Sequence, residues 1–152
     1  MSRWKLAVVL CCVSLCVFAA EDPFSGQWKL NPSKSKLPPP LPQSQVSYIE
    51  ADATHIQVRE EIINDKGERM TITVDAKFDG KDYPIVGAPS ADTVAYQRLN
   101  SRTVKGVAKK DGKVILRETV VVSPDGMTMT GTYHGTDATG RQVRAVAVFD
   151  KQ

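Results

Sequence analysis

Apolar and polar side chains alternate along most of the chain beyond residue 45, with the period of a β-strand. Residues 69–78 carry Met, Ile, Val, Ala and Phe at every second position, with Thr, Asp and Lys between them. Alternate side chains of a strand point to opposite faces, so this segment has one apolar and one polar face. We therefore predict a strand that lies between a core and solvent.

Turn signals separate further runs of this kind about every 8–12 residues. Asp79-Gly80, Asp111-Gly112 and Asp125-Gly126 are dipeptides typical of tight hairpins. No segment has a convincing helical period. The predicted strands cover residues 24–30, 46–49, 55–63, 69–78, 83–86, 93–99, 102–110, 113–122, 127–134 and 141–149. Because an open sheet of this size would expose long edges, we predict an all-β fold, a single antiparallel up-and-down β-barrel of about 8–10 strands.

The first nineteen residues follow a different pattern. Arg3 and Lys5 precede an apolar run at residues 6–18, and small residues follow it, as in a signal peptide. A membrane anchor would need roughly 20 apolar residues. We therefore predict a signal peptide at residues 1–19, one exported domain at residues 20–152, and a secreted or periplasmic location.

All three cysteines, Cys11, Cys12 and Cys16, fall within this leader. Lipid attachment at Cys16 is the less favoured alternative, because Leu15 stands where a lipoprotein signal has a small residue. The exported domain then has no thiol, which excludes a disulfide framework and a Cys-based metal or redox site. The leader also holds two of the charges in the formal net +3, so the domain is nearly neutral and we expect no nucleic-acid partner.

Residues 31–44 contain five prolines. Proline lacks a backbone N–H and fixes φ, so a regular helix or a central strand is excluded here. We predict a stiff, extended connector that is exposed or crosses a barrel mouth. A Pro-rich ligand for a partner protein is the alternative.

The apolar faces of the predicted strands form the candidate interior. Such residues can fill a small barrel or line an adaptable cavity, and the pattern does not distinguish the two. The uncharged side chains that we predict to contact a ligand there are Met70, Ile72, Val74, Phe78, Tyr96, Met129, Tyr133 and Phe149.

Three charged residues share the parity of these apolar faces: Glu60, Arg98 and Glu118. A buried charge is costly unless it is paired. One hypothesis is therefore an internal polar cluster, with Glu60 or Glu118 near Arg98, that orients the polar end of a ligand. The alternative is that each strand twists out of the barrel there and the charge is solvated.

Gly26-Gln27-Trp28, in the first predicted strand, has the Gly-x-Trp pattern of the calycins, the superfamily of lipocalins and fatty-acid-binding proteins. The domain length, the successive hairpins and residues 149–151 are also similar to that superfamily. Residues 28–35, 78–84, 91–94 and 123–126 resemble a group of secreted bacterial lipocalin-like proteins, a resemblance that covers nearly all of the exported domain. It implies a lipocalin-like barrel for a small ligand.

The resemblance also assigns roles to single residues. Gly26 and Trp28 would close one barrel end, with an arginine lying over the tryptophan; Arg144 is the best positional candidate and Arg98 the second. Fatty-acid-binding proteins hold a carboxylate through Arg-x-Tyr in the last strand, but those positions are Ala147 and Phe149 here. A ligand is therefore expected to be neutral or held through other groups.

Catalytic and metal-binding signatures are absent from the sequence. His55 and His134, the two histidines, lack the spacing of zinc ligands, and no phosphate loop or nucleophile motif occurs. We predict no catalytic residue, no metal and no cofactor.

Together these patterns predict an exported, non-enzymatic monomer that binds a small hydrophobic or amphipathic molecule inside the barrel. The alternative is a structural or interaction domain of the cell envelope with a filled barrel and no ligand. An enzyme with a site inside the barrel ranks third. The volume of the interior void discriminates between the first two.

Overall fold

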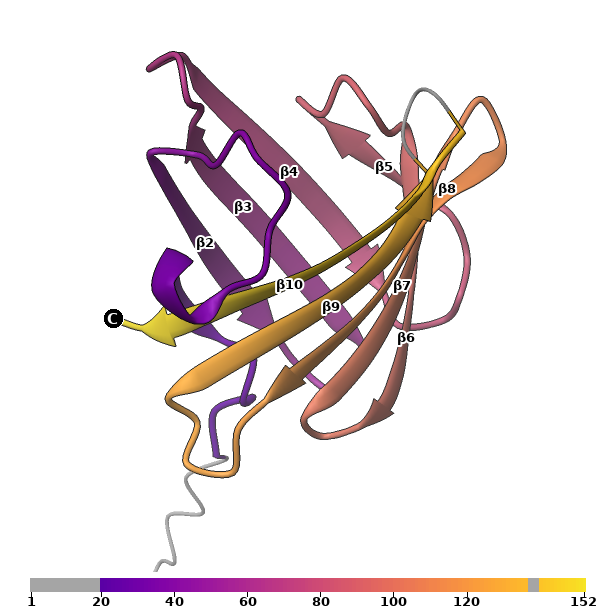
Figure 1. Ribbon diagram of the computed structural model, residues 1–152. Coiled ribbons are helices and arrows are strands. Elements are labelled where there is room, and N and C mark those ends of the chain that lie inside the picture. The colour runs from indigo at the N-terminus through magenta and orange to yellow at the C-terminus, as the bar shows by residue number, and fades with distance from the viewer. Residues whose placement is uncertain (1–19, 137–139) are drawn as a thin grey trace, which may run out of the picture.

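Ten antiparallel strands close into one barrel in the computed structural model, which describes residues 20–136 and 140–152 (Figure 1). The strands are β1 (Gly26–Leu30), β2 (Ser44–Ala51), β3 (His55–Ile63), β4 (Arg69–Lys77), β5 (Tyr83–Val86), β6 (Thr93–Asn100), β7 (Thr103–Lys110), β8 (Lys113–Val122), β9 (Thr128–Thr136) and β10 (Gln142–Lys151). Each pairs with its neighbours in sequence, and β1 pairs with β10 to close the ring. The predicted all-β, up-and-down antiparallel barrel is confirmed. The predicted signal peptide, residues 1–19, lies outside the described residues.

The hairpin between β7 and β8 shows how a local signal fixes the register. Asp111 and Gly112 both have positive φ, 49° and 73°, as a two-residue type I′ turn requires. This turn has the twist of the strands that it joins, so Lys110 lies directly opposite Lys113.

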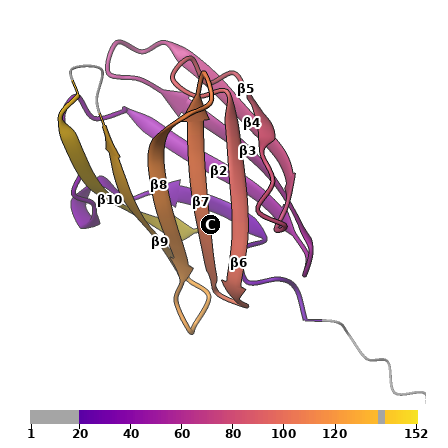
Figure 2. The same ribbon diagram turned by 90° about the vertical axis from the view of Figure 1, so that its right-hand side faces the viewer.

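β5 is the most weakly joined strand of the ring. It pairs with β4 only through Thr73↔Val86 and Val74↔Ile85, and with β6 through two further residue pairs. β3 and β4, in contrast, pair along their whole length. Figures 1 and 2 show β2–β4 in one wall of the barrel and β6–β9 in the wall that faces it.

The Pro-rich segment runs along the seam between β10 and β2. It begins with a 3-10 turn, η1 (Pro32–Lys34), and then Lys36 forms a β-bridge with Val146. Farther on, the backbone N–H of Gln43 donates to a carbonyl at the end of β3, and Leu37 packs against the core. The segment therefore completes the wall beyond the short β1.

The end of the barrel around β1 is filled with buried side chains. Trp28 is fully buried, and its Nε1–H donates to the carbonyl oxygen of Phe24 at 2.8 Å. The Arg98 guanidinium lies 4.3 Å from the centroid of the Phe78 ring and forms an ion pair of 2.6 Å with Asp22. The N-terminal segment thus folds across this end, which we call the closed end.

The cation over Trp28 is Lys151, with its Nζ 5.2 Å from the ring centroid. Arg144, the predicted candidate, is exposed on the outer face beside His134. The inward positions of β10 are those of Ala147 and Phe149, so position 144 has outward parity. The expectation for Arg144 is therefore wrong.

The strand predicted at residues 127–134 begins one residue later, at Thr128, so Met127 belongs to the preceding turn and is 55% exposed. Across residues 20–136 and 140–152 we find no helix with the length and apolar character needed to span a membrane.

Candidate functional site

A row of inward-facing residues crosses the wall formed by β6 to β9. The register pairs Tyr96 with Gly106, Gly106 with Glu118, and Glu118 with Tyr133. Directly paired residues of antiparallel strands point to the same face, so the three long side chains enter the barrel at one level. Glycine at 106 makes this possible, because a Cβ there would lie 2.7 Å from Cγ of Glu118.

The facing wall contributes Glu60 from β3. Glu60 is paired with Ser47 of β2 and with Ile72 of β4. The Ser47 hydroxyl donates to Oε1 of Glu60 at 3.0 Å, and Nε2 of Gln45 donates to the same oxygen at 3.5 Å. Ser47 is buried, and it shares the inward parity of Trp28, with which it is paired.

Between the two walls lies a partly open pocket of about 70 Å³, which we call the void. Because a water molecule needs about 10–15 Å³ of such space, the void has room for a few water molecules. Six of the predicted ligand-contacting residues line it: Glu60, Tyr96, Glu118, Met129, Tyr133 and Phe149. Its remaining lining is Phe24, Ser47, Ile49, Ile56, Val58, Val104 and Val120.

Five predicted ligand-contacting residues do not line this void. Met70 and Ile72 are half-buried, and Val74 is buried in the core. Phe78 and Arg98 belong to the closed end, where their side chains stack on each other. The hypothesis that Arg98 pairs with an interior glutamate is wrong, because the N-terminal segment supplies Asp22 as its partner.

Three polar groups that face the void lack a protein partner. Within residues 20–136 and 140–152, neither the Glu118 carboxyl nor the hydroxyls of Tyr96 and Tyr133 have a hydrogen-bond partner. All three side chains are half-buried. All three line the void, and the space beside them can accept a molecule that hydrogen-bonds to them.

Burial and mutual repulsion set the charge of this site. Burial, and next the charge of Glu60, raise the pKa of Glu118 from 4.5 to about 7. Burial also raises the pKa of Glu60, but the hydrogen bonds from Ser47 and Gln45 stabilise its anion. Glu60 is therefore the first of the two to ionise, and Glu118 is half-protonated near neutral pH.

The two tyrosines stay protonated. Burial raises the pKa of both Tyr96 and Tyr133 well above 10, and the charges of Glu118 and Glu60 raise them further. Their hydroxyls are thus neutral groups that can donate or accept a hydrogen bond.

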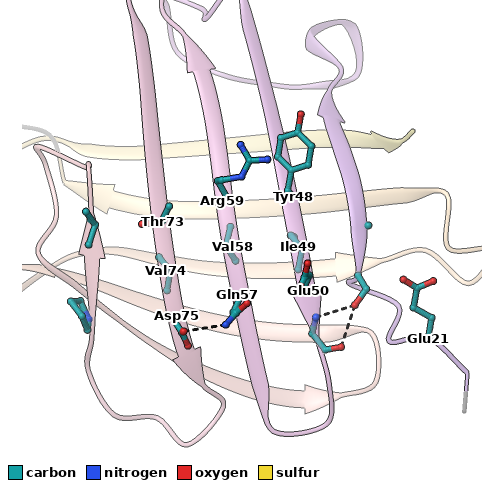
Figure 3. Close-up of a pocket in the computed structure, with 15 residues that line it drawn as sticks. Glu21, Tyr48, Ile49, Glu50, Gln57, Val58, Arg59, Thr73, Val74 and Asp75 are labelled. Carbon is teal, nitrogen blue, oxygen red and sulfur yellow. Dashed lines mark hydrogen bonds between the residues drawn. The ribbon is translucent and has the colours of Figure 1, made fainter.

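A larger, open groove of about 900 Å³ lies outside the barrel, over β2 to β5 (Figure 3). Some of its polar side chains contact one another: the Arg59 guanidinium stacks 4.1 Å from the Tyr48 ring centroid, and Gln57 donates to Asp75 at 3.1 Å. Solvent can satisfy the polar groups of the open groove, whereas Glu118, Tyr96 and Tyr133 face the barrel interior, so we take the void rather than the groove as the candidate site.

Neither histidine belongs to the void. His55 lies 2.5 Å from Asp75 on the outer surface, and His134 is exposed on β9. In the part of the chain that the structure describes, no group of His, Cys, Asp or Glu side chains is arranged to hold a metal ion.

Sequence parity found Glu60, Glu118 and both tyrosines but missed Ser47, Gly106 and Asp22. Ser47 and Gly106 could have been found from the sequence, since each lies at an inward position of its strand. Asp22 has no such signal, because its contact with Arg98 joins positions that are 76 residues apart.

The chain matches no protein-family model and no curated protein. Among solved structures it is similar to the zebrafish ileal bile acid-binding protein complexed with cholic acid. The TM-score is 0.55 at 12% sequence identity, and the match covers 86% of this chain and 99% of that chain. At this identity the likeness shows the fold alone, so the chain shares its barrel fold with that protein.

Proposed function

We propose that the protein binds a small hydrophobic or amphipathic molecule inside the barrel, with the polar end of the ligand at Glu118, Tyr96 and Tyr133. The observation that carries the proposal is the convergence of these three polar groups, unpartnered within the described residues, on a void whose other lining residues are apolar apart from Glu60 and Ser47. A polar group that faces an apolar interior is normally hydrogen-bonded to protein, to water or to a ligand, because an unmade hydrogen bond there costs free energy. A bound molecule that supplies the missing hydrogen bonds removes that cost.

The apolar part of the ligand extends away from the closed end. Farther from the closed end than Tyr96, Glu118 and Tyr133, the inward positions hold Ile62, Met70 and Leu116, which are all apolar and only half-buried. Access from that side needs no change in the packing of Trp28. The weakly joined β5 also allows the wall to widen around a ligand larger than the void.

The likeness to a bile acid-binding protein supports a binding role over an enzymatic one. Export to a secreted or periplasmic location rests on the signal-peptide pattern of residues 1–19, and a monomeric state is also part of this proposal. N-terminal sequencing of the protein from its host and sedimentation analysis test these two points.

Native mass spectrometry of the protein from its own host tests the binding function. A copurifying small molecule is the expected result, and an apo mass in every preparation contradicts it. Val120 lines the void, whereas its neighbour Val121 is exposed. The variant Val120→Phe fills the void and is expected to lose the ligand, while the matched control Val121→Phe retains it.

The small size of the void favours a second candidate, an interaction domain with a filled barrel. Pockets for small molecules usually measure about 300–1,000 Å³, and this void is far below that range. The same experiment separates the two functions, because a filled barrel gives an apo mass for the protein and for both valine variants.

A further inference from the structure

We propose that the polar end of the ligand is a protonated amine, held by the Glu118 carboxylate inside the barrel. This inference rests on the proposed binding function and names the chemical class of the ligand. It follows from the charges, the hydrogen-bonding capacity and the proton content of the interior site.

The charged residues that line the void are all acidic. Two carboxyl groups, Glu60 and Glu118, line it, and none of its lining residues is Lys, Arg or His. The nearby cation, Arg98, does not line the void and is paired with Asp22 at 2.6 Å. A positive ligand group would compensate the charge of Glu60 and Glu118, which the protein itself leaves unbalanced.

The hydrogen-bonding capacity of the site fits an ammonium group. A primary ammonium has three N–H donors and no acceptor. Glu118 offers carboxylate oxygens, and Tyr96 and Tyr133, in the same inward row, offer hydroxyl oxygens that accept. Glu60 already accepts hydrogen bonds from Ser47 and Gln45, so Glu118 is the carboxyl that lacks a donor.

The same charges disfavour an acid. An anionic head group would lie close to ionised Glu60, with no cation on the wall of the void to balance it. The inward positions of β10, where an Arg-x-Tyr clamp would lie, hold Ala147 and Phe149, both buried and apolar. In this respect the interior is suited to ligands unlike cholic acid, the acid bound by the zebrafish protein.

Amine binding must also displace a proton. Glu118, with a pKa of about 7, is half-protonated at pH 7, and the ion pair with an ammonium requires its carboxylate form. Binding at pH 7 therefore releases about half a proton from Glu118 to the buffer. The other titratable groups that face Glu118 from neighbouring strands and from across the void are Tyr96, Tyr133 and Glu60.

The test compares probes that share one chain and differ in the head group. Isothermal titration calorimetry of the full chain measures the binding of octylamine, 1-octanol and octanoate at pH 7. We expect octylamine to bind at least tenfold more tightly than 1-octanol, and octanoate to bind most weakly. We also expect octylamine affinity to fall about thirtyfold from pH 8 to pH 5.5, as Glu118 becomes protonated.

Variants assign the effect to the carboxyl group. In Glu118→Gln the preference for octylamine over 1-octanol and the proton release at pH 7 are expected to disappear. The matched control Glu61→Gln, on the exposed face of β3, is expected to keep both. Equal or tighter binding of 1-octanol or octanoate by the unaltered protein overturns the amine inference and leaves the binding function intact. Failure of all three probes to bind overturns both.

Discussion

Replacing Glu118 by Gln should stabilise the barrel, and the gain should grow as the pH rises. Glu118 has no hydrogen-bond partner within residues 20–136 and 140–152, and its folded-state pKa is about 7 against an ordinary 4.5. The folded protein therefore keeps a proton at this carboxyl that the unfolded chain releases. The stability from this proton is fully present below about pH 4.5 and is lost as the pH rises through about 7.

The size of the effect follows from the shift. The rise in the pKa of Glu118 from 4.5 to about 7 corresponds to about 3 kcal/mol in the free energy of unfolding, most of which is lost between pH 5 and pH 8. Because glutamine resembles the protonated carboxyl, Glu118→Gln should equal the unaltered protein near pH 5. At pH 8 it should be more stable by about 2–3 kcal/mol.

Urea unfolding followed by circular dichroism at pH 5, 6, 7 and 8 measures this difference directly. This pH range avoids the acid range, where protonation of carboxyls with lowered pKa values, such as Asp92 and Asp150, would destabilise the folded protein. Glu61→Gln, on the exposed face of β3 where Glu61 pairs with Arg59, should change the free energy of unfolding by less than about 1 kcal/mol. If the Glu118→Gln difference were independent of pH, or if the variant were less stable at pH 8, the reasoning about this site would be refuted.

Three further changes test the packing around the site. Asp22→Ala should lower the free energy of unfolding by about 3–5 kcal/mol in urea titrations. The side chains of Asp22 and Arg98 are only 9% and 15% exposed, and Nε and Nη2 of Arg98 already lack hydrogen-bond partners within residues 20–136 and 140–152. A loss below about 1 kcal/mol contradicts this role. Gly106→Ala should lower the free energy of unfolding by about 1–3 kcal/mol, since the added Cβ would lie 2.7 Å from Cγ of Glu118. In a double-mutant cycle, adding Glu118→Ala should recover part of that loss, and strictly additive effects argue against the contact. Ser47→Ala should raise the pKa of Glu60 further, because it removes the 3.0 Å hydrogen bond to the carboxylate, and an unchanged or lowered value in an NMR titration of the Glu60 side chain rules out this stabilisation.

The sequence by itself determined the strands and their faces. Strand period, hairpin dipeptides and proline positions are local properties, so short stretches of the sequence are enough to reveal them. The segment predicted at residues 69–78 is found as Arg69–Lys77, and the Asp111-Gly112 dipeptide forms the predicted hairpin. Parity along a strand likewise places Glu60 and Glu118 inside, because side chains alternate regularly between the two faces.

Only the tertiary structure decided which inward residues meet. The Asp22–Arg98 ion pair, the position of Lys151 over Trp28 and the convergence of Glu60 and Glu118 on one void all depend on how the ring closes. Parity specifies a face but not a height in the barrel, and it specifies nothing about the strand on the opposite wall. The depth of each strand and the path of the N-terminal segment follow from long-range pairing. Among the described residues this pairing gives Arg98 a partner, Asp22, and gives Glu118 none.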